Sequence, residues 1–308
     1  MTKIILDTDI GSEMTDAAAL TLAAGSPEIN LLGVTTVTHD AVFRASVAKR
    51  FLELLNKNNI PVSAGFGSSG EHAWEKELIF PDGYKPAVLD TRPGWQLILD
   101  LVNQNKNDVT LVGIGTTTNI AKALEEDPEL PRKVSQLILM GGMLESPIVN
   151  GKTIPRGFEY NFCNDSASVE KILKAGFNLT LLPGDLTFHQ DDPWTEEELE
   201  RLAQIKHPVA DLLVKLKDIS LVSMKEGMQK AGLPLEFAKP WVNDELVIAY
   251  LIKPELFETE DLLIRWELPD KYPRLIPSKT GYPIKLITKT DFVKTRQFII
   301  DKLKDVLD

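Results

Sequence analysis

The 308-residue sequence is short of several features, and each shortage narrows what it can be. It contains one cysteine, which excludes an internal disulfide framework and suits a reducing compartment. Basic residues are also too few to balance the acids, since 34 Lys and Arg face 45 Asp and Glu for a formal net charge of −11. Because nucleic-acid binders need a basic face, this charge argues against a nucleic-acid partner and favours a small solute.

Long apolar runs and linkers are missing as well. No run approaches the roughly 18 to 20 residues of a membrane span, and MTKIILD leaves no room for a signal peptide before the first predicted strand. We therefore expect a soluble, cytoplasmic protein with no membrane partner. Since no repeat or Gly/Ser-rich linker marks a boundary, we expect one domain over residues 1–308, with 43% apolar residues to form its core.

What is present is an alternation of short β-rich runs with helical patterns. The predicted strands are KIILD, INLLGVTTV, VSAG, DVTLVGIG, SQLILMGG and NLTLLPGD. The predicted helices are 15–25, 41–57, 92–104, 118–126 and 165–175, then a helical region from 195 to 256, strands near 262–267 and 283–288, and a helix over 291–307. This order predicts an α/β fold with a mostly parallel, doubly wound sheet and additional helices in the C-terminal half.

Polar and glycine residues collect where the predicted strands end. In such a sheet, ligands bind beyond the carboxyl ends of the strands, so these residues predict the floor of a site. The contributions are Asp7 and Asp9 from the first strand, Thr35, Thr36, His39 and Asp40 from the second, and 115–119, 140–142 and 184–185 from three later strands.

The first of these strand ends is rich in acids. Asp7 and Asp9 close the strand, Gly11 permits a tight turn, and Asp16 falls in the first turn of the next helix. Mutual repulsion would raise the pKa of one or more of these carboxyl groups unless a cation neutralised them, and Ca²⁺ or Mg²⁺ would suit oxygen ligands. A structural role is equally open, in which Asp16 favours the helix dipole and the other two hydrogen-bond neighbouring loops.

Two further acid and amide pairs occur in the second half of the chain. Asn243 and Asp244 open an apolar helix, and Glu159 and Asn161 lie in a predicted loop. Taken alone, Asp244 is most often a helix N-cap, and the other pair has a similar structural explanation.

The motifs together carry a resemblance that none carries alone. ILDTDIGSEMTDAAAL, LLGVTTV, GTTTNIAKAL, LILMGG, EYNFCNDSAS and NDELVIAYLIKPELF, in this order over roughly residues 3 to 257, resemble the inosine-uridine preferring nucleoside hydrolase family. The resemblance implies the nucleoside hydrolase-like fold and hydrolysis of an N-glycosidic bond, with release of base and ribose. It also implies a single Ca²⁺ that holds the ribose diol and a nucleophilic water, a role in nucleoside salvage, and a homo-oligomer, dimer or tetramer.

The resemblance also implies roles for individual residues. Asp9 would be the general base and a metal ligand, Asp16 and Asp244 would complete the carboxylate ligands, Ile114 would offer its backbone carbonyl, and Asp7 would support them. Towards the substrate, Glu159 and Asn161 would hydrogen-bond ribose hydroxyls, and Met140 would pack against the sugar.

Three departures from the family pattern bear on activity. Thr15 stands where the longer form of the first motif has a carboxylate that grips a ribose hydroxyl, and Glu13 is either its substitute or a solvated turn residue. Asp40 replaces an amide after the second strand; it would restore the missing charge, and the adjacent His39 either titrates near neutrality or is an ordinary hydrogen-bonded residue.

The third departure concerns the leaving group. Asn243 stands where many members have a histidine thought to protonate a departing purine, and an amide cannot deliver a proton, although it can still hydrogen-bond a base edge. Loss of a general acid typically costs on the order of 10² to 10⁴ in rate. Usual inosine hydrolysis is therefore not expected.

Aromatic residues near these motifs leave further alternatives open. Trp74, Phe80 and Tyr84 lie in a loop marked by Gly and Pro, where they could stack on a base or pack on the surface. Trp194, Phe237 and Trp241 could line a leaving-group pocket or fill the core.

The sequence thus supports two main hypotheses and a minor one. The first is an active Ca²⁺-dependent N-ribosyl hydrolase with altered specificity; the second is a catalytically weak or inactive relative that binds a nucleoside or ribose-containing ligand. The third rests on ILDTDIGS, which also looks like the start of a haloacid dehalogenase-like phosphatase with Asp7 as nucleophile. The later strand end LLPGDLTF lacks the matching second acid that this family needs.

Overall fold

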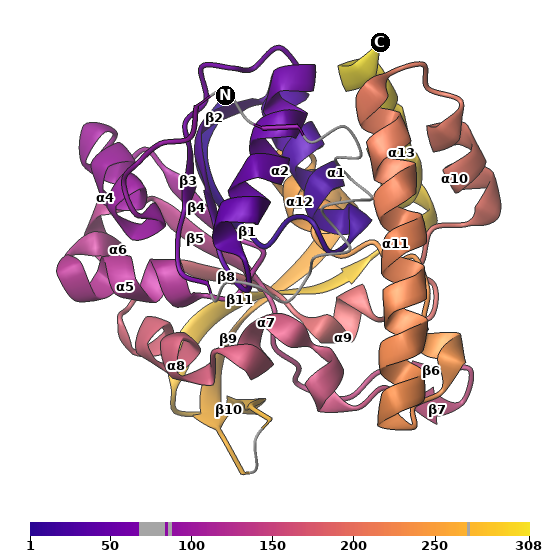
Figure 1. The fold of residues 1–308 in the computed structure, drawn as a ribbon. Helices are drawn as coiled ribbons and strands as arrows, with labels where there is room; N and C mark the ends of the chain where they lie inside the picture. The colour runs from indigo at the N-terminus through magenta and orange to yellow at the C-terminus, as the bar shows by residue number, and fades with distance from the viewer. Residues whose placement is uncertain (68–83, 86–87, 270–271) are drawn as a thin grey trace.

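The computed structural model describes residues 1–67, 84–85, 88–269 and 272–308. A nine-stranded sheet runs through it in the order β10-β9-β11-β8-β5-β4-β1-β2-β3 (Figure 1). The strands are β1 (Thr2–Thr8), β2 (Ile29–Thr36), β3 (Val62–Ala64), β4 (Thr110–Gly113), β5 (Gln136–Met140), β8 (Leu179–Leu182), β9 (Phe257–Glu267), β10 (Arg274–Ser278) and β11 (Tyr282–Thr290). Within this sheet, pairing from β11 to β3 is parallel, whereas the β9–β11 and β9–β10 pairs are antiparallel. The mostly parallel sheet is therefore confirmed.

Helices cover both faces of this sheet (Figure 1). One group packs around α1 and the other around α5, each with its own apolar cluster. The first group is α1 (Met14–Gly25), α2 (Ala41–Leu54), α10 (Glu196–Ala203), α11 (Pro208–Ala231), α12 (Glu245–Ile252) and α13 (Phe292–Leu307). The second is α4 (Gly94–Gln104), α5 (Thr118–Glu126), α6 (Leu130–Lys133) and α8 (Ser166–Lys174), while the short α7 (Tyr160–Asn164) and α9 (Gly184–Thr187) follow strand ends.

Several short elements were not expected from the sequence. They are α6, α7, α9, the β6–β7 hairpin (Ile148–Val149 and Lys152–Thr153) and β10. Strand β10 contains Pro277, which argues against a strand in a sheet interior but is tolerated here because β10 is the edge strand. Of the loop aromatics, Trp74 and Phe80 lie outside the described residues.

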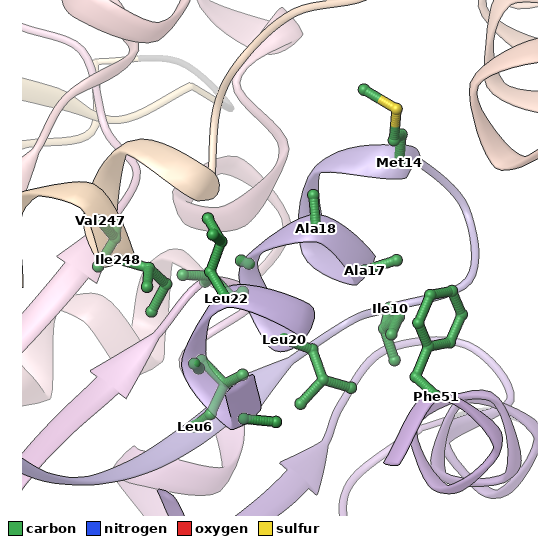
Figure 2. Packing of buried hydrophobic residues seen from close by; sticks show 14 of the residues in the cluster. Leu6, Ile10, Met14, Ala17, Ala18, Leu20, Leu22, Phe51, Val247 and Ile248 are labelled. Atoms are coloured by element: carbon green, nitrogen blue, oxygen red, sulfur yellow. The ribbon is translucent and has the colours of Figure 1, made fainter. Parts of the chain in front are cut away.

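Helix α1 is buried on every side. All its residues from Met14 to Ala24 are buried, which is the pattern of a helix in the centre of a core rather than on its surface. Its helical neighbours are α2, α11, α12 and α13, and Figure 2 shows Phe51 of α2, Val247 and Ile248 of α12, and Leu6 of β1 packed around it. Asp16, in its first turn, is therefore held on a tightly packed element.

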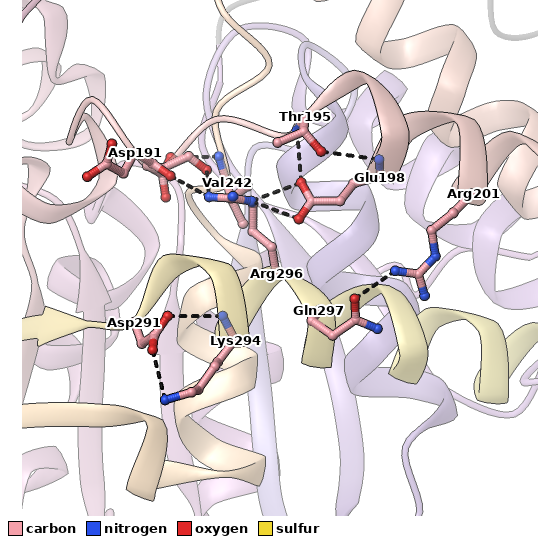
Figure 3. Close-up of polar contacts among 10 residues, drawn as sticks. Asp191, Thr195, Glu198, Arg201, Val242, Asp291, Lys294, Arg296 and Gln297 are labelled. Carbon is pink, nitrogen blue, oxygen red and sulfur yellow. Dashed lines mark hydrogen bonds and ion pairs between the residues drawn. The ribbon is translucent and has the colours of Figure 1, made fainter.

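A polar clamp fixes the chain before α12. Arg296 of α13 donates to the carboxylate of Glu198 at the start of α10 (2.9 and 3.1 Å), and both side chains are nearly buried (Figure 3). Beside it, Asp192 accepts a hydrogen bond from the Val242 N–H (2.8 Å). The segment that leads into Asn243 and Asp244 is thereby tied to two helices.

The described ranges contain no helix with the length and apolar character that a membrane span requires.

Candidate active site

The acids after β1 divide into a structural and a cavity-facing set. Asp7 is fully buried, and its Oδ1 accepts from Thr35 Oγ1 (2.6 Å) and Asn119 Nδ2 (2.7 Å). Burial raises the pKa of Asp7 to about 7 against these hydrogen bonds, and the charge of Asp9 adds to the rise. Asp7 thus joins β1, β2 and the start of α5 beneath the site and does not line the cavity described below.

Asp9, Asp16 and Asp244 are brought together from β1–α1 and the start of α12. Burial raises the pKa of each, and Asp9 repels the charges of the other two. Asp16 accepts from Thr8 Oγ1 (2.5 Å). Asp244 lies at the N-cap position of α12, yet its side chain makes no capping hydrogen bond, and its Oδ1 is buried with no hydrogen-bond partner in the described part of the chain. The commoner capping role is therefore not what this carboxylate performs.

Asn161 ties two strand ends together at the same site. Its Nδ2 donates to the backbone carbonyls of Ile114 (2.9 Å) and Met140 (3.1 Å), which follow β4 and end β5. With its donors used in this way, the amide can offer its oxygen to a ligand. The neighbouring Glu159 is buried and caps α7 by accepting from Phe162 N–H (3.1 and 3.2 Å), while burial raises its pKa to about 7.

These groups surround a cavity of about 290 Å³. The predicted site residues that line it are Asp9, Glu13, Thr15, Asp16, His39, Ile114, Met140, Glu159, Asn161, Asn243 and Asp244. The sequence therefore identified most of the polar wall, from six separate stretches of chain.

The departures from the family pattern have specific partners. Thr15 donates from Oγ1 to Asp244 Oδ2 (2.6 Å). Glu13 lines the cavity, and burial together with the nearby charge of Asp9 raises its pKa to about 7. Glu13 is half-buried, and its place on the cavity wall favours the substitute role over that of a solvated turn residue.

Asp40 lies elsewhere. Its carboxylate caps α2 by accepting from the Phe43 N–H (2.9 Å), and it is not on the cavity wall that the described residues form. The expected compensation for Thr15 by Asp40 is not what this placement favours.

Other lining residues were not singled out from the sequence. Arg44 of α2 is buried and donates to the carbonyl of Ile10 (3.0 Å) and to Ser12 Oγ (2.8 Å), which holds the β1–α1 turn. Its charge also lowers the raised pKa of Asp9. Because Arg44 reaches this turn across 34 positions of sequence, no local motif could have placed it there.

An aromatic wall faces the carboxylates. It is formed by Phe158, Phe188 and Trp241, with Met224 beside them, and the Phe188 and Trp241 rings meet edge to face at 5.6 Å between centroids. Of the aromatics weighed from the sequence, Trp241 lines the cavity, whereas Trp194 and Phe237 are core residues that do not. Tyr84 donates to Glu53 and packs against α2, away from the cavity.

The oxygen atoms of the site suit a hard cation, although the described residues do not form a complete set of metal ligands. Within the described residues, no group of three or more His, Cys, Asp or Glu side chains is arranged to hold a metal ion. The fit comes from the orphaned Asp244 Oδ1 and from carboxylates whose mutual repulsion a cation would relieve. The phosphatase alternative does not fit, because its nucleophile Asp7 is buried behind the cavity wall.

Comparison with known proteins gives a consistent result. The family model described as inosine-uridine preferring nucleoside hydrolase matches residues 4–288. A pyrimidine-specific ribonucleoside hydrolase RihA from Enterobacter sp. (strain 638) is 31% identical over 286 residues, which cover 87% of this chain and 85% of the relative. The RihA of Shewanella sp. (strain MR-7) is 31% identical over 84% of this chain and 80% of its own length.

Solved structures show the same fold. A purine-preferring ribonucleoside hydrolase from Gardnerella vaginalis aligns with a TM-score of 0.81 at 20% identity, over 99% of both chains. An inosine-uridine preferring nucleoside hydrolase from Bacillus anthracis aligns with a TM-score of 0.78 at 19% identity, over 99% of this chain and 100% of that chain.

Proposed function

The chain belongs to the inosine-uridine preferring nucleoside hydrolase family, and from this premise we propose that it is a Ca²⁺-dependent ribonucleoside hydrolase with altered specificity. Family membership makes it a hydrolase that acts on N-glycosyl compounds. The observation that carries the finer proposal is the convergence of Asp9, Asp16 and Asp244 on one cavity wall with a buried, unpartnered carboxylate oxygen.

The proposed calcium ligands are all oxygen atoms. They are the carboxylates of Asp9, Asp16 and Asp244 and the carbonyl of Ile114. The Ile114 oxygen accepts a hydrogen bond from Asn161 with one lone pair and can offer the other to the ion. When bound, the ion supplies positive charge that makes a water easier to deprotonate and orders the ribose hydroxyls.

The residues of the chain perform the remaining steps. Asp9 accepts a proton from the attacking water as its oxygen bonds to C1′, and the C1′–N bond breaks with its electron pair on the departing base. Glu159 and the Asn161 amide oxygen would accept hydrogen bonds from ribose hydroxyls, and Met140 would pack against the sugar.

The choice of base is the less constrained part of the proposal. The Enterobacter relative is named pyrimidine-specific and the Gardnerella structure purine-preferring. In this chain the aromatic part of the cavity lining provides apolar contacts for a base, and the Asn243 Oδ1, buried without a hydrogen-bond partner among the described residues, can accept a hydrogen bond. We propose a nucleoside whose departure does not rely on an acid at residue 243.

Two further expectations accompany this function. The single cysteine supports a place in the reducing cytoplasm, and the family resemblance supports a homo-oligomer, dimer or tetramer. Size-exclusion chromatography with light scattering measures the second directly.

The test is ribose release from a panel of purine, pyrimidine and modified nucleosides. We expect turnover that disappears with a calcium chelator, returns with Ca²⁺, and falls on the order of 10² to 10⁴-fold in Asp9→Asn. Asp211→Asn, in the first turn of α11 outside the cavity, is the matched control. Tight nucleoside binding without ribose release, in a folded and calcium-loaded protein, would favour the catalytically weak relative instead.

A further inference from the structure

The residues assigned to the reaction so far leave the departing base without a proton donor. A base leaving C1′ gains an electron pair and departs faster when a group protonates it, and Asn243 has no proton of suitable acidity to give. Apart from the carboxyl groups and Arg44, the described lining residues that carry an ionisable proton are Tyr160 and His39.

These two residues are hydrogen-bonded to each other at the cavity wall. Tyr160 Oη lies 2.8 Å from His39 Nε2, and the two ring centroids are 6.1 Å apart. Tyr160 opens α7, whereas His39 lies in the loop between β2 and α2, so the bond joins elements separated by 121 positions of sequence. Tyr160 is 39% exposed, which places the pair where a substrate and solvent can both reach it.

The backbone that presents His39 is held in an uncommon conformation. Thr38 and His39 have φ angles of 74° and 46°, a left-handed region that residues other than glycine rarely adopt. Such geometry persists only where the surroundings determine it. Here Arg44 Nε donates to the Thr38 carbonyl (3.0 Å) and Thr38 N–H donates to the Phe66 carbonyl (2.9 Å). The imidazole is therefore aimed by the fold rather than left on a free loop.

The acids of the cavity have other partners. Glu159 caps α7, and Asp244 accepts from Thr15. Glu13 lies in the turn after Asp9, and its carboxyl group interacts with the charges of Asp9 and Arg44. Glu13 also lines the cavity, so it is the competing acid that the Glu13→Gln variant tests.

We propose that Tyr160 is the catalytic residue that protonates the leaving base and that His39 resupplies its proton. As the C1′–N bond breaks, the phenol proton passes to the base nitrogen that receives the electron pair. The Nε2 proton of a His39 imidazolium then passes to Tyr160 Oη, which leaves a neutral imidazole that solvent reprotonates. The relay avoids a free phenolate, which burial beside Asp9 disfavours because it raises the pKa of Tyr160. This inference rests on the proposed function.

The experiment compares two substrates that share a sugar and differ in their leaving group. Uridine and inosine need a proton on the departing base, whereas 4-nitrophenyl β-D-ribofuranoside releases a stabilised phenolate that does not. Tyr160→Phe should lower kcat for the hydrolysed nucleoside on the order of 10² to 10⁴-fold and change kcat for the nitrophenyl riboside less than about threefold. His39→Gly, which accepts the left-handed backbone, should show the same split, and added imidazole should restore nucleoside turnover only.

Matched variants keep the test decisive. Tyr84→Phe removes another hydrogen-bonded tyrosine hydroxyl, outside the cavity, and should alter neither substrate. Equal losses on both substrates in Tyr160→Phe, no loss on either, or a selective loss in Glu13→Gln in place of Tyr160→Phe would each overturn the relay while leaving the hydrolase intact. Wild-type turnover of the nitrophenyl riboside without any nucleoside turnover would also overturn it. Turnover of neither substrate would instead remove the proposed function itself.

Discussion

Single residues decide how the acid cluster is tolerated. Thr15 replaces a carboxylate of the family motif with a hydroxyl, and the hydroxyl donates to Asp244 Oδ2 at 2.6 Å in a buried setting. This bond lowers the pKa of Asp244, while burial and the charge of Asp16 raise it. Thr15 therefore helps to hold the carboxylate of the proposed calcium ligand Asp244 in place before any ligand binds, so the threonine does more than remove a charge.

Replacing Thr15 with valine should show this contribution. The variant leaves a buried carboxylate oxygen without its donor, so we expect the free energy of unfolding to fall by about 1–3 kcal/mol. Urea unfolding in the presence of a calcium chelator measures it. Thr21→Val on the same helix removes a hydroxyl that donates to the Ala17 carbonyl and should cost less. A loss in Thr15→Val no larger than in Thr21→Val would contradict the role given to Asp244.

Asp192 should make stability depend on pH. Burial raises its pKa well above the ordinary value of 3.8; the charge of Glu245 also raises it, while the Val242 N–H and Arg296 lower it. Because the folded state binds this proton more tightly than the unfolded chain, the stabilisation is complete below the ordinary pKa and is lost as pH rises toward the folded pKa. Asp192→Asn should therefore gain stability relative to wild type as pH increases above about 4.

Urea unfolding of both proteins across the pH range gives this difference. Asp90→Asn supplies a control of opposite sign, since Arg92 lowers the pKa of Asp90 and the wild-type stabilisation there is lost only as pH falls below the ordinary value. If the difference in free energy of unfolding between Asp192→Asn and wild type did not change with pH, the folded and unfolded states would bind that proton equally.

At the scale of elements, periodicity predicted the parallel strands and long helices because each repeats an apolar pattern over many residues. It missed β10 and the β6–β7 hairpin because these elements are short. In β10, Pro277 argues against a strand, but a proline is tolerated there because β10 is the edge strand. It also could not show that α1 is buried all round. That property comes from four helices distant in sequence, and it gives Asp16 its fixed position.

The packing of α1 against α13 provides a prediction at this scale. A Cβ on Gly25 would lie 2.0 Å from Val306 Cγ1, so Gly25→Ala should lower the free energy of unfolding by about 1–3 kcal/mol through overpacking. The double variant with Val306→Ala should regain most of that loss. Gly227→Ala lies within α11 with open space around it and should instead stabilise by about 0.5–1 kcal/mol. Urea unfolding compares all three, and a stabilised Gly25→Ala would contradict the contact.

At the scale of the whole molecule, the site exists only when distant parts of the chain meet. The cluster of Asp7, Asp9 and Asp16 could be predicted from the sequence because a strand end, a tight turn and a helix start have local signatures, whereas the roles expected of Asp244 and Glu159 came from the family resemblance. Tyr160, Arg44 and the Phe158 and Phe188 part of the aromatic wall were not predicted, because their placement arises from contacts across tens of residues. Asp40 is a similar case. Its position after β2 is that of the family motif, but its carboxylate caps α2.

A site assembled in this way should couple calcium binding to folding. An ion that binds the folded state alone stabilises it by about 2.7 kcal/mol at 100 times its Kd, because the unfolded chain cannot gather Asp9, Asp16 and Asp244. We therefore expect Ca²⁺ to raise the Tm of wild type in a thermal unfolding scan, and expect most of that rise to vanish in Asp244→Asn. Asp185→Asn removes a half-buried carboxylate that accepts from the Leu144 and Glu145 N–H groups, away from the cavity. It should lower the starting Tm but keep the full calcium response. A wild-type Tm that does not respond to Ca²⁺, or an Asp244→Asn response equal to that of wild type, would remove calcium from the proposed site without touching the assigned family.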